Sequence, residues 1–130
     1  MTPRDEEPVD IDRFILEQIE TVPHMEALLL VWNSRPKVWS ADEMGHAIFV
    51  TTAEAGAVLD DLTRRGFVAA ARNSEQTWHY NPEPGRDAIM SVLDRTYRRE
   101  LIRVTRLIHS KAPSSVREFA KAFRLKKERE

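Results

Sequence analysis

Apolar residues recur every three or four positions along most of the chain, which is the spacing of amphipathic helices. A first run covers residues 10–22 and presents one apolar face, made of Phe14, Ile15, Ile19 and Val22. A second run continues to Trp32, with Thr21 placed to cap it and Pro23 in its first turn. Because the second run is apolar on nearly every side, we expect that helix at the centre of the core.

Two capping boxes predict the starts of two further helices, eleven residues apart. They are Ser40-Ala41-Asp42-Glu43 and Thr51-Thr52-Ala53-Glu54. In such a box the first hydroxyl and the carboxylate three residues later satisfy exposed backbone N–H groups reciprocally. The first box predicts a helix of about two turns, to Ile48 or Phe49. The second predicts a helix that ends before Gly66 and buries Ala55, Val58, Leu59 and Leu62.

Short segments with strand propensity lie on both sides of a turn-rich segment after Gly66. Residues 67–71 and 77–80 predict an antiparallel hairpin, joined by residues 72–75. Residues 37–39 predict a further, minimal strand ahead of the first capping box. Proline and glycine at residues 82–85 end the hairpin.

A long helix is predicted over residues 86–109, with a continuous apolar stripe. The stripe consists of Ile89, Leu93, Tyr97, Leu101, Val104 and Ile108. So long a stripe on so small a domain needs a cover, and a second copy of the same helix is the simplest one. The alternative is that the helix folds back over the core of its own chain.

The predicted fold class is therefore mainly α with a small β-hairpin. Residues 1–9 are expected to be a disordered N-terminus, residues 10–85 the globular domain, and residues 86–109 the dimerisation helix. Residues 110–130 are expected to form a short helix and a basic tail, since Ser115-Val116-Arg117-Glu118 is a third capping box.

The composition is that of a globular protein, because 42% of the 130 residues are hydrophobic and 32% are charged. The chain has no cysteine, which excludes disulfides and thiolate zinc sites and fits a reducing compartment. The longest apolar run, residues 27–32, is too short to span a bilayer. The acidic start has no basic segment ahead of an apolar stretch, so we expect no secretory signal and a cytoplasmic location.

The net charge of −1 conceals an asymmetry along the chain. Residues 1–90 contain 8 Lys and Arg against 16 Asp and Glu, whereas residues 91–130 contain 12 against 5. A basic C-terminal part is typical of contact with nucleic acid. It is equally consistent with attraction between the two parts, within one chain or across a dimer.

The sequence contains no motif for catalysis, metal binding or a cofactor. The histidines His24, His46, His79 and His109 are spread one per predicted element, and no HExxH, CxxC, GxGxxG or GKS/T pattern occurs. His46 with Asp42 or Glu43 supplies at most three metal ligands, and Glu43 is already explained as a cap. We therefore expect neither an enzyme nor a bound metal or cofactor.

The order of the predicted elements resembles that of winged helix-turn-helix transcriptional regulators of bacterial type, most closely the MarR-like and related dimeric families. The resemblance is carried by residues 51–68, TTAEAGAVLDDLTRRGFV. Within them, residues 59–68 are similar to the family's L-x-x-L-x-x-x-G-[LF]-[VI] passage from the recognition helix into the wing. The resemblance implies that residues 40–49 form the positioning helix and that residues 52–65 form the recognition helix, which enters the major groove.

The resemblance also implies two sets of DNA contacts. In and just before the recognition helix they are Thr51, Thr52, Ala53, Glu54, Ala57, Arg64 and Arg65. In the wing and its flank they are Lys37, Arg72, Asn73, Ser74 and Gln76. The implied protein is a cytoplasmic homodimer that binds double-stranded DNA.

The outward face of the predicted recognition helix is small and acidic. Opposite its buried residues lie Ala53, Gly56, Ala57, Asp60 and Asp61. Lysines and arginines on phosphates usually supply most of the affinity for DNA, and the two aspartates oppose it. The alternative is a winged-helix interaction module whose acidic, small-residue face binds a basic protein partner.

Overall fold

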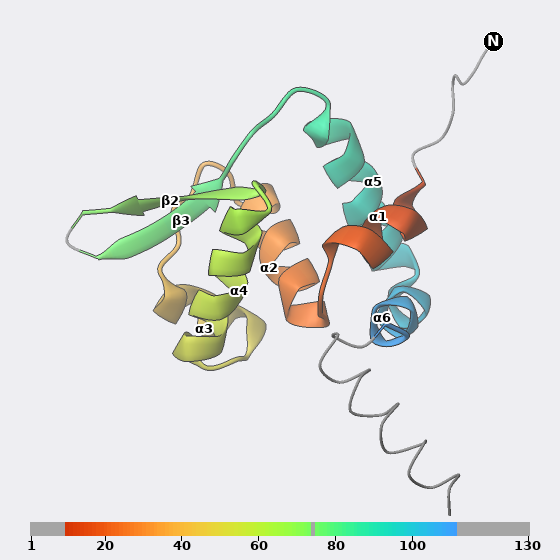
Figure 1. The fold of residues 1–130 in the computed structure, drawn as a ribbon, viewed down its shortest axis with the longest axis horizontal. Coiled ribbons are helices and arrows are strands. Elements are labelled where there is room, and N and C mark those ends of the chain that lie inside the picture. Colours follow the sequence, from red (N-terminus) through yellow and green to blue (C-terminus); the bar gives the residue numbers. More distant parts are fainter. Residues whose placement is uncertain (1–9, 74, 112–130) are drawn as a thin grey trace, which may run out of the picture.

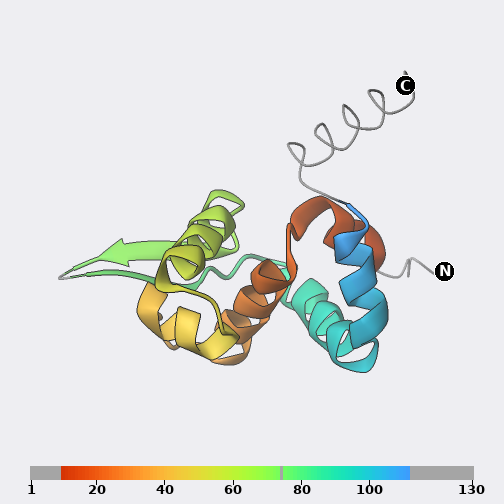
Figure 2. The same ribbon diagram turned by 90° about the horizontal axis from the view of Figure 1, so that it is seen from below.

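The computed structural model describes residues 10–73 and 75–111 and has a two-stranded sheet and six helices in this part of the chain. The elements are α1 (Ile11–Gln18), α2 (Val22–Asn33), α3 (Ala41–Ile48), α4 (Thr52–Arg64), β2 (Val68–Arg72), β3 (Gln76–Tyr80), α5 (Arg86–Arg99) and α6 (Leu101–His109). The hairpin projects at one end of the molecule, helices α1, α5 and α6 gather at the other, and α2 lies between them (Figure 1, Figure 2). The predicted fold class is confirmed.

The two capping boxes predicted at residues 40–43 and 51–54 are formed, and the third, at residues 115–118, lies outside the described residues. The Ser40 hydroxyl accepts from the Glu43 backbone N–H at 3.1 Å, and Glu43 Oε1 accepts from the Ser40 N–H at 3.0 Å. Thr51 and Glu54 repeat this arrangement with two distances of 3.0 Å. Because each box satisfies orphan N–H groups of the first turn, the starts of α3 and α4 are fixed by local sequence.

Strands β2 and β3 pair antiparallel, from Val68 opposite Tyr80 to Arg72 opposite Gln76. The minimal strand predicted at residues 37–39 is present as a single bridge, in which Trp39 and Trp78 exchange two backbone hydrogen bonds of 2.8 Å. Trp39 and Trp78 are both buried, so this bridge attaches the hairpin to the segment that leads into α3.

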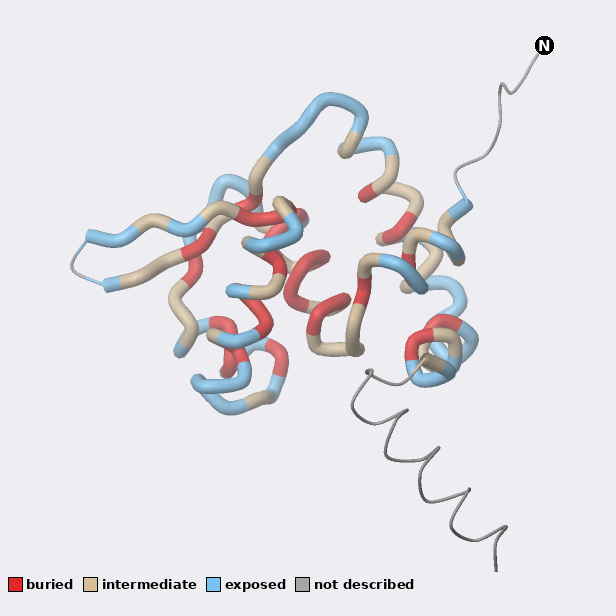
Figure 3. Tube along the Cα trace, in the orientation of Figure 1, coloured by how far each residue is buried: buried red, intermediate tan, exposed pale blue. Residues whose placement is uncertain are grey.

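Helix α2 is the centre of the core, as predicted. Seven of its twelve residues are buried, and the buried segments of the chain converge on it (Figure 3). Helix α4 contributes the four predicted core residues, Ala55, Val58, Leu59 and Leu62. These apolar contacts unite α2, α3 and α4 into the three-helix part of the domain.

The first helix is shorter than predicted, because α1 ends at Gln18 and not near residue 22. Ile19 adopts an extended backbone conformation, and Thr21 takes up the β-region geometry of an N-cap, with its hydroxyl accepting from the His24 N–H at 3.3 Å. The chain thus changes direction between the two helices while Ile15 and Ile19 both stay buried.

The prediction of one continuous helix over residues 86–109 is wrong. Glu100, with φ −130° and ψ 48°, separates α5 from α6. After this break α6 packs against α1, and it also contacts α5 (Figure 2). The physical reason is that the chain can cover its own apolar stripe by folding back, which was the alternative that the sequence left open.

The six residues of the predicted dimerisation stripe are consequently divided. Leu93, Val104 and Ile108 are buried within the chain, Ile89 and Tyr97 are half-buried, and Leu101 remains 48% exposed. The N-terminus predicted at residues 1–9 lies outside the described residues, and so does all of the C-terminal region predicted at residues 110–130 except residues 110 and 111. Among the described residues, no helix is long and apolar enough to cross a membrane.

Candidate nucleic-acid interface

Helices α3 and α4 form a helix-turn-helix, and the start of α4 is tied to α3 by a side-chain contact. The Thr52 hydroxyl donates to Asp42 Oδ1 at 3.1 Å. Glu54 Oε1 accepts from both the backbone N–H and the hydroxyl of Thr51, at 3.0 and 3.1 Å. Three predicted DNA-contact residues, Thr51, Thr52 and Glu54, are thus brought together at this end of α4 in defined orientations.

The predicted outward face of α4 is confirmed at three of its five positions and differs at two. Ala53, Ala57 and Asp60 are exposed, as is the neighbouring Glu54. Gly56 is half-buried instead, and a Cβ built there would lie 3.8 Å from the Cβ of Ala41 in α3. Asp61 also turns inward, because its carboxylate meets the buried His24 of α2. Sequence spacing alone did not indicate this pair, since the two residues are 37 positions apart.

The predicted cations around α4 all have contacts within the chain. Arg64 pairs with Asp61, and Lys37 lies 3.8 Å from Glu43 with its ammonium 4.7 Å from the Trp39 ring centroid. Arg65 turns toward α1, where it donates to the Glu17 carbonyl at 3.3 Å. The side chains of Arg64 and Lys37 remain 70% and 45% exposed and have several N–H donors each, so they can bind a further partner, whereas Arg65 is directed toward α1.

The hairpin carries the remaining predicted contacts. Arg72 is exposed at the end of β2 and donates to Gln76 Oε1 across the hairpin at 3.3 Å. Asn73 is exposed in the turn, and Ser74 lies outside the described residues. The hairpin extends away from the helices (Figure 1), so Arg72 is a cation held clear of the core.

The balance of exposed charge differs between α4 and the hairpin. Asp42, Glu43, Glu54 and Asp60 are exposed around the start and middle of α4, whereas Arg72 lies on the hairpin. The hairpin also carries the exposed Glu75, so its formal charges cancel, whereas these four carboxylates around α4 oppose the approach of a duplex.

A separate hollow of about 440 Å³ lies between α2, the end of α3 and α5, and Tyr97, Leu30 and Phe49 are among its lining residues. The Tyr97 hydroxyl donates to Glu26 Oε2 at 3.0 Å, and burial together with this contact raises the pKa of Tyr97. Trp32, Trp39 and Trp78 are buried, so the three tryptophans belong to the core and to the base of the hairpin. Within residues 10–73 and 75–111, no three histidine or carboxylate side chains are grouped to hold a metal ion.

The architecture described above is that of a winged helix-turn-helix protein, and comparison with solved structures supports this. The chain is similar to the adhesin competence repressor AdcR of Streptococcus pyogenes, with 13% identity, 93% of this chain and 90% of that chain covered, and a TM-score of 0.51. It is also similar to a mutant of S. aureus MepR bound to an oligodeoxyribonucleotide, with 11% identity, 89% and 83% coverage, and a TM-score of 0.54.

A MarR family protein from Bacillus stearothermophilus is similar at 18% identity, with 91% of this chain and 81% of that chain covered and a TM-score of 0.51. No family model matches the sequence, and no curated protein matches it. The chain therefore shares the fold of MarR-type winged-helix regulators. The predicted resemblance is confirmed at the level of fold.

Proposed function

We propose that the protein is a DNA-binding transcriptional regulator that acts as a homodimer in the cytoplasm. The observation that carries this proposal is the geometry of α4 and the hairpin. Ala53, Glu54 and Ala57 are exposed on the outer side of a helix whose start is rigidly capped, and the wing projects from the same domain. A structure of the same fold has been solved with an oligodeoxyribonucleotide bound, which supports the same role here.

The outward residues of α4 favour particular base edges. Alanine side chains make apolar contact with the thymine methyl group, and a glutamate accepts a hydrogen bond from cytosine N4. Both capping bonds of Glu54 use Oε1, so Oε2 is the acceptor offered to a base. Ala53, Glu54 and Ala57 are therefore proposed to contact the edges of pyrimidine bases. The proposed phosphate contacts are made by Thr51, Thr52, Lys37 and Arg64.

The proposed wing contacts supply the cationic part of the interface. Arg72 would bind phosphate or enter the minor groove, and Asn73, Ser74 and Gln76 would support it with hydrogen bonds. Arg65 faces α1 in this structure, so we assign it to positioning of α4 more than to contact with DNA.

A second copy of the chain is proposed to cover the apolar side chains left exposed on α1 and α6. Leu16 is 39% exposed, Leu101 48% and Ile102 64%. Burying them against their symmetry mates would remove apolar area from water. Two recognition helices would then address two half-sites about 34–36 Å apart, or a multiple of that distance.

The experiment is a selection of duplexes from a random library, followed by a salt titration of the best sequence. We expect log K to fall with log salt by about 0.9 for each phosphate neutralised, and Arg72→Ala to weaken all duplexes alike while reducing that slope by about one. Glu54→Gln is expected to change which base is selected. The matched control is Glu75→Gln, which removes the same charge from the wing turn.

No binding to any duplex at low salt would overturn this proposal. Under that outcome the acidic face of α4 becomes the interaction surface for a basic protein, and a bulky residue at Ala57 would abolish capture of that partner.

A further inference from the structure

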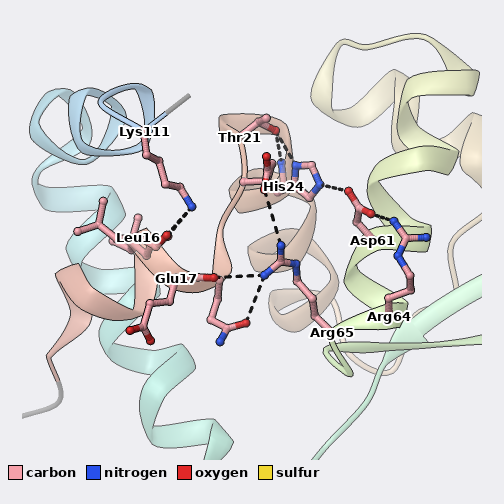
Figure 4. A network of polar contacts seen from close by, with 11 residues as sticks. Leu16, Glu17, Thr21, His24, Asp61, Arg64, Arg65 and Lys111 are labelled. Atoms are coloured by element: carbon pink, nitrogen blue, oxygen red, sulfur yellow. Dashed lines mark hydrogen bonds and ion pairs between the residues drawn. The ribbon is translucent and has the colours of Figure 1, made fainter. Parts of the chain in front are cut away.

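The recognition helix α4 buries an apolar face whose contacts do not specify direction, and its start is tied to α3 by the Thr52–Asp42 hydrogen bond. Two polar side chains, one in its last turn and one at its C-cap, make directional contacts with other helices. Asp61 and Arg65 are four residues apart, so they lie on one side of the helix, and both reach other helices (Figure 4). Together they tie α4 to the start of α2 and to the end of α1.

His24 makes the first of these ties and is 5% exposed. Its Nε2 lies 2.9 Å from Asp61 Oδ2, and its Nδ1 lies 2.6 Å from Thr21 Oγ1. Because Thr21 Oγ1 already accepts from the His24 backbone N–H, its hydroxyl proton is available to donate to Nδ1. This network assigns the ring proton to Nε2, which donates it to Asp61.

The charges around the imidazole act in both directions. The carboxylates of Asp61 and Glu20 favour the protonated ring, whereas Arg65 and Lys111 disfavour it. Burial is the largest effect and lowers the pKa of His24 below its ordinary value of 6.5. The neutral tautomer, with both ring nitrogens bonded, is therefore the resting form at neutral pH.

Arg65 makes the second tie, at the C-terminal end of α1. It donates to the Glu17 carbonyl at 3.3 Å and to Gln18 Oε1 at 3.5 Å. Lys111, just beyond α6, donates to the neighbouring Leu16 carbonyl at 2.6 Å. Carbonyls in the last turn of a helix have no partner within it, so these two cations satisfy them.

We propose that His24 is a positioning residue for the recognition helix. The Thr52–Asp42 bond holds only the start of α4, whereas the directional bond to Asp61 together with the Arg65 tie fixes the rotation of its C-terminal half. The rotation decides whether Ala53 and Glu54 meet base edges, so His24 acts on sequence discrimination through Asp61. This inference rests on the proposed DNA-binding function.

The test compares Asp61→Ala with Asp60→Ala, which remove the same charge from adjacent positions of α4. Asp60 is exposed, and the structure gives it no bond to another described residue, so its loss should raise affinity for all duplexes alike. Asp61→Ala should instead lower the ratio of specific to non-specific affinity about tenfold, the worth of one base contact. A mere loss of folded protein cannot produce this result, because it reduces both affinities by the same factor.

A second pair of variants tests the imidazole itself. His24→Gln keeps an amide donor for Asp61 and an acceptor for Thr21, so it should retain the specificity ratio. His24→Leu keeps the bulk but loses both bonds, so it should lower the ratio as Asp61→Ala does. An unchanged ratio in Asp61→Ala, or equal ratios in the leucine and glutamine variants, would overturn the inference.

A readout without DNA separates this inference from the proposed function. If the wild-type chain binds no duplex, the proposed function fails, and amide hydrogen exchange of α4 then decides the positioning role. Faster exchange at residues 62–65 in Asp61→Ala than in Asp60→Ala, compared at equal global stability, supports the tie to His24. Equal exchange in the two variants overturns it.

Discussion

Helix α4 and the pair α5–α6 are all amphipathic, but their boundaries are set in different ways. Helix α4 begins at a reciprocal capping box and is followed by Gly66 at φ 84°, a conformation that suits glycine. Helices α5 and α6 begin at Gly85 and Glu100 without a side-chain cap. A helix with local caps can therefore be delimited from sequence, whereas the bounds of a helix without such caps depend on tertiary packing.

The two regions also differ in how their charges are used. Around α4, Glu43 pairs with Lys37 and Asp61 with Arg64, which are close in sequence, whereas the basic side chains of α5 and α6 also pair with a distant helix. Arg103 Nη1 lies 2.8 Å from Oδ2 of Asp12 at the start of α1, and Arg98 Nε lies 3.0 Å from Asp94 Oδ2. The Arg103–Asp12 pair joins the basic and the acidic parts of the chain. It therefore favours the interpretation that the two parts attract each other within one chain.

The largest effect is expected from Ile108→Ala in α6, which tests whether α6 is stabilised by packing on its own chain. Ile108 is 1% exposed, so its truncation leaves a cavity and should cost about 2–5 kcal/mol of unfolding free energy. Urea unfolding at two protein concentrations measures it. Because α6 packs on α1 of the same chain, the loss relative to wild type should be the same at both concentrations.

The matched control for this variant is Leu101→Ala, at a side chain that is 48% exposed on the same helix. It should cost far less in the monomer. A destabilisation by Ile108→Ala that disappeared on dilution would mean that α6 is stabilised by a partner copy and not by α1.

A smaller effect is expected at the capped region from Thr51→Ala. The substitution removes the side chain that accepts from the Glu54 N–H, which should cost about 1 kcal/mol, measured by thermal unfolding. Thr52→Ala is the control, since the Thr52 hydroxyl donates only to Asp42 among the described residues. Equal costs for the two variants would contradict the view that the box fixes the start of α4.

The pH dependence of stability sharpens the comparison further. Burial lowers the pKa of His24 below 6.5, so the unfolded chain binds a proton that the folded chain resists. The stabilisation present above about pH 6.5 should therefore be lost progressively as the pH falls. Unfolding free energies measured from about pH 7.5 down to about 5.5 should fall less steeply in His24→Gln. An identical slope in the two proteins would show that the pKa of His24 is the same in the folded and the unfolded chain.

The smallest effect is expected from Arg103→Ala. Its guanidinium contacts Asp12 and Glu100, and these contacts raise its pKa, but the site is on the surface. Solvent screening makes such pairs weak, so the melting temperature should change only slightly, and less at high salt. Arg106→Ala is the control, because Arg106 makes no ion pair within the described part of the chain. A large, salt-independent loss would contradict this expectation.

Much of the winged-helix part could be predicted from sequence because its signals are local. The two capping boxes, the period of Val58 and Leu62, and the hairpin of residues 67–80 each depend on residues close together in the chain. The proposed interface residues followed from the same elements. The inward turn of Asp61 could not be predicted, because it depends on His24, which is distant in sequence and buried by folding.

The sequence by itself determined where α3 and α4 begin, which face of α4 is buried, and that a hairpin follows it. The tertiary structure alone decided that the stripe from Ile89 to Ile108 breaks at Glu100, and that Asp61 and Arg65 hold α4 to α2 and α1. The physical reason is the distance along the chain over which each kind of interaction acts. Caps and periodicity act within a turn or two of the chain, whereas the cover of an apolar stripe is chosen by whichever surface the whole fold brings against it.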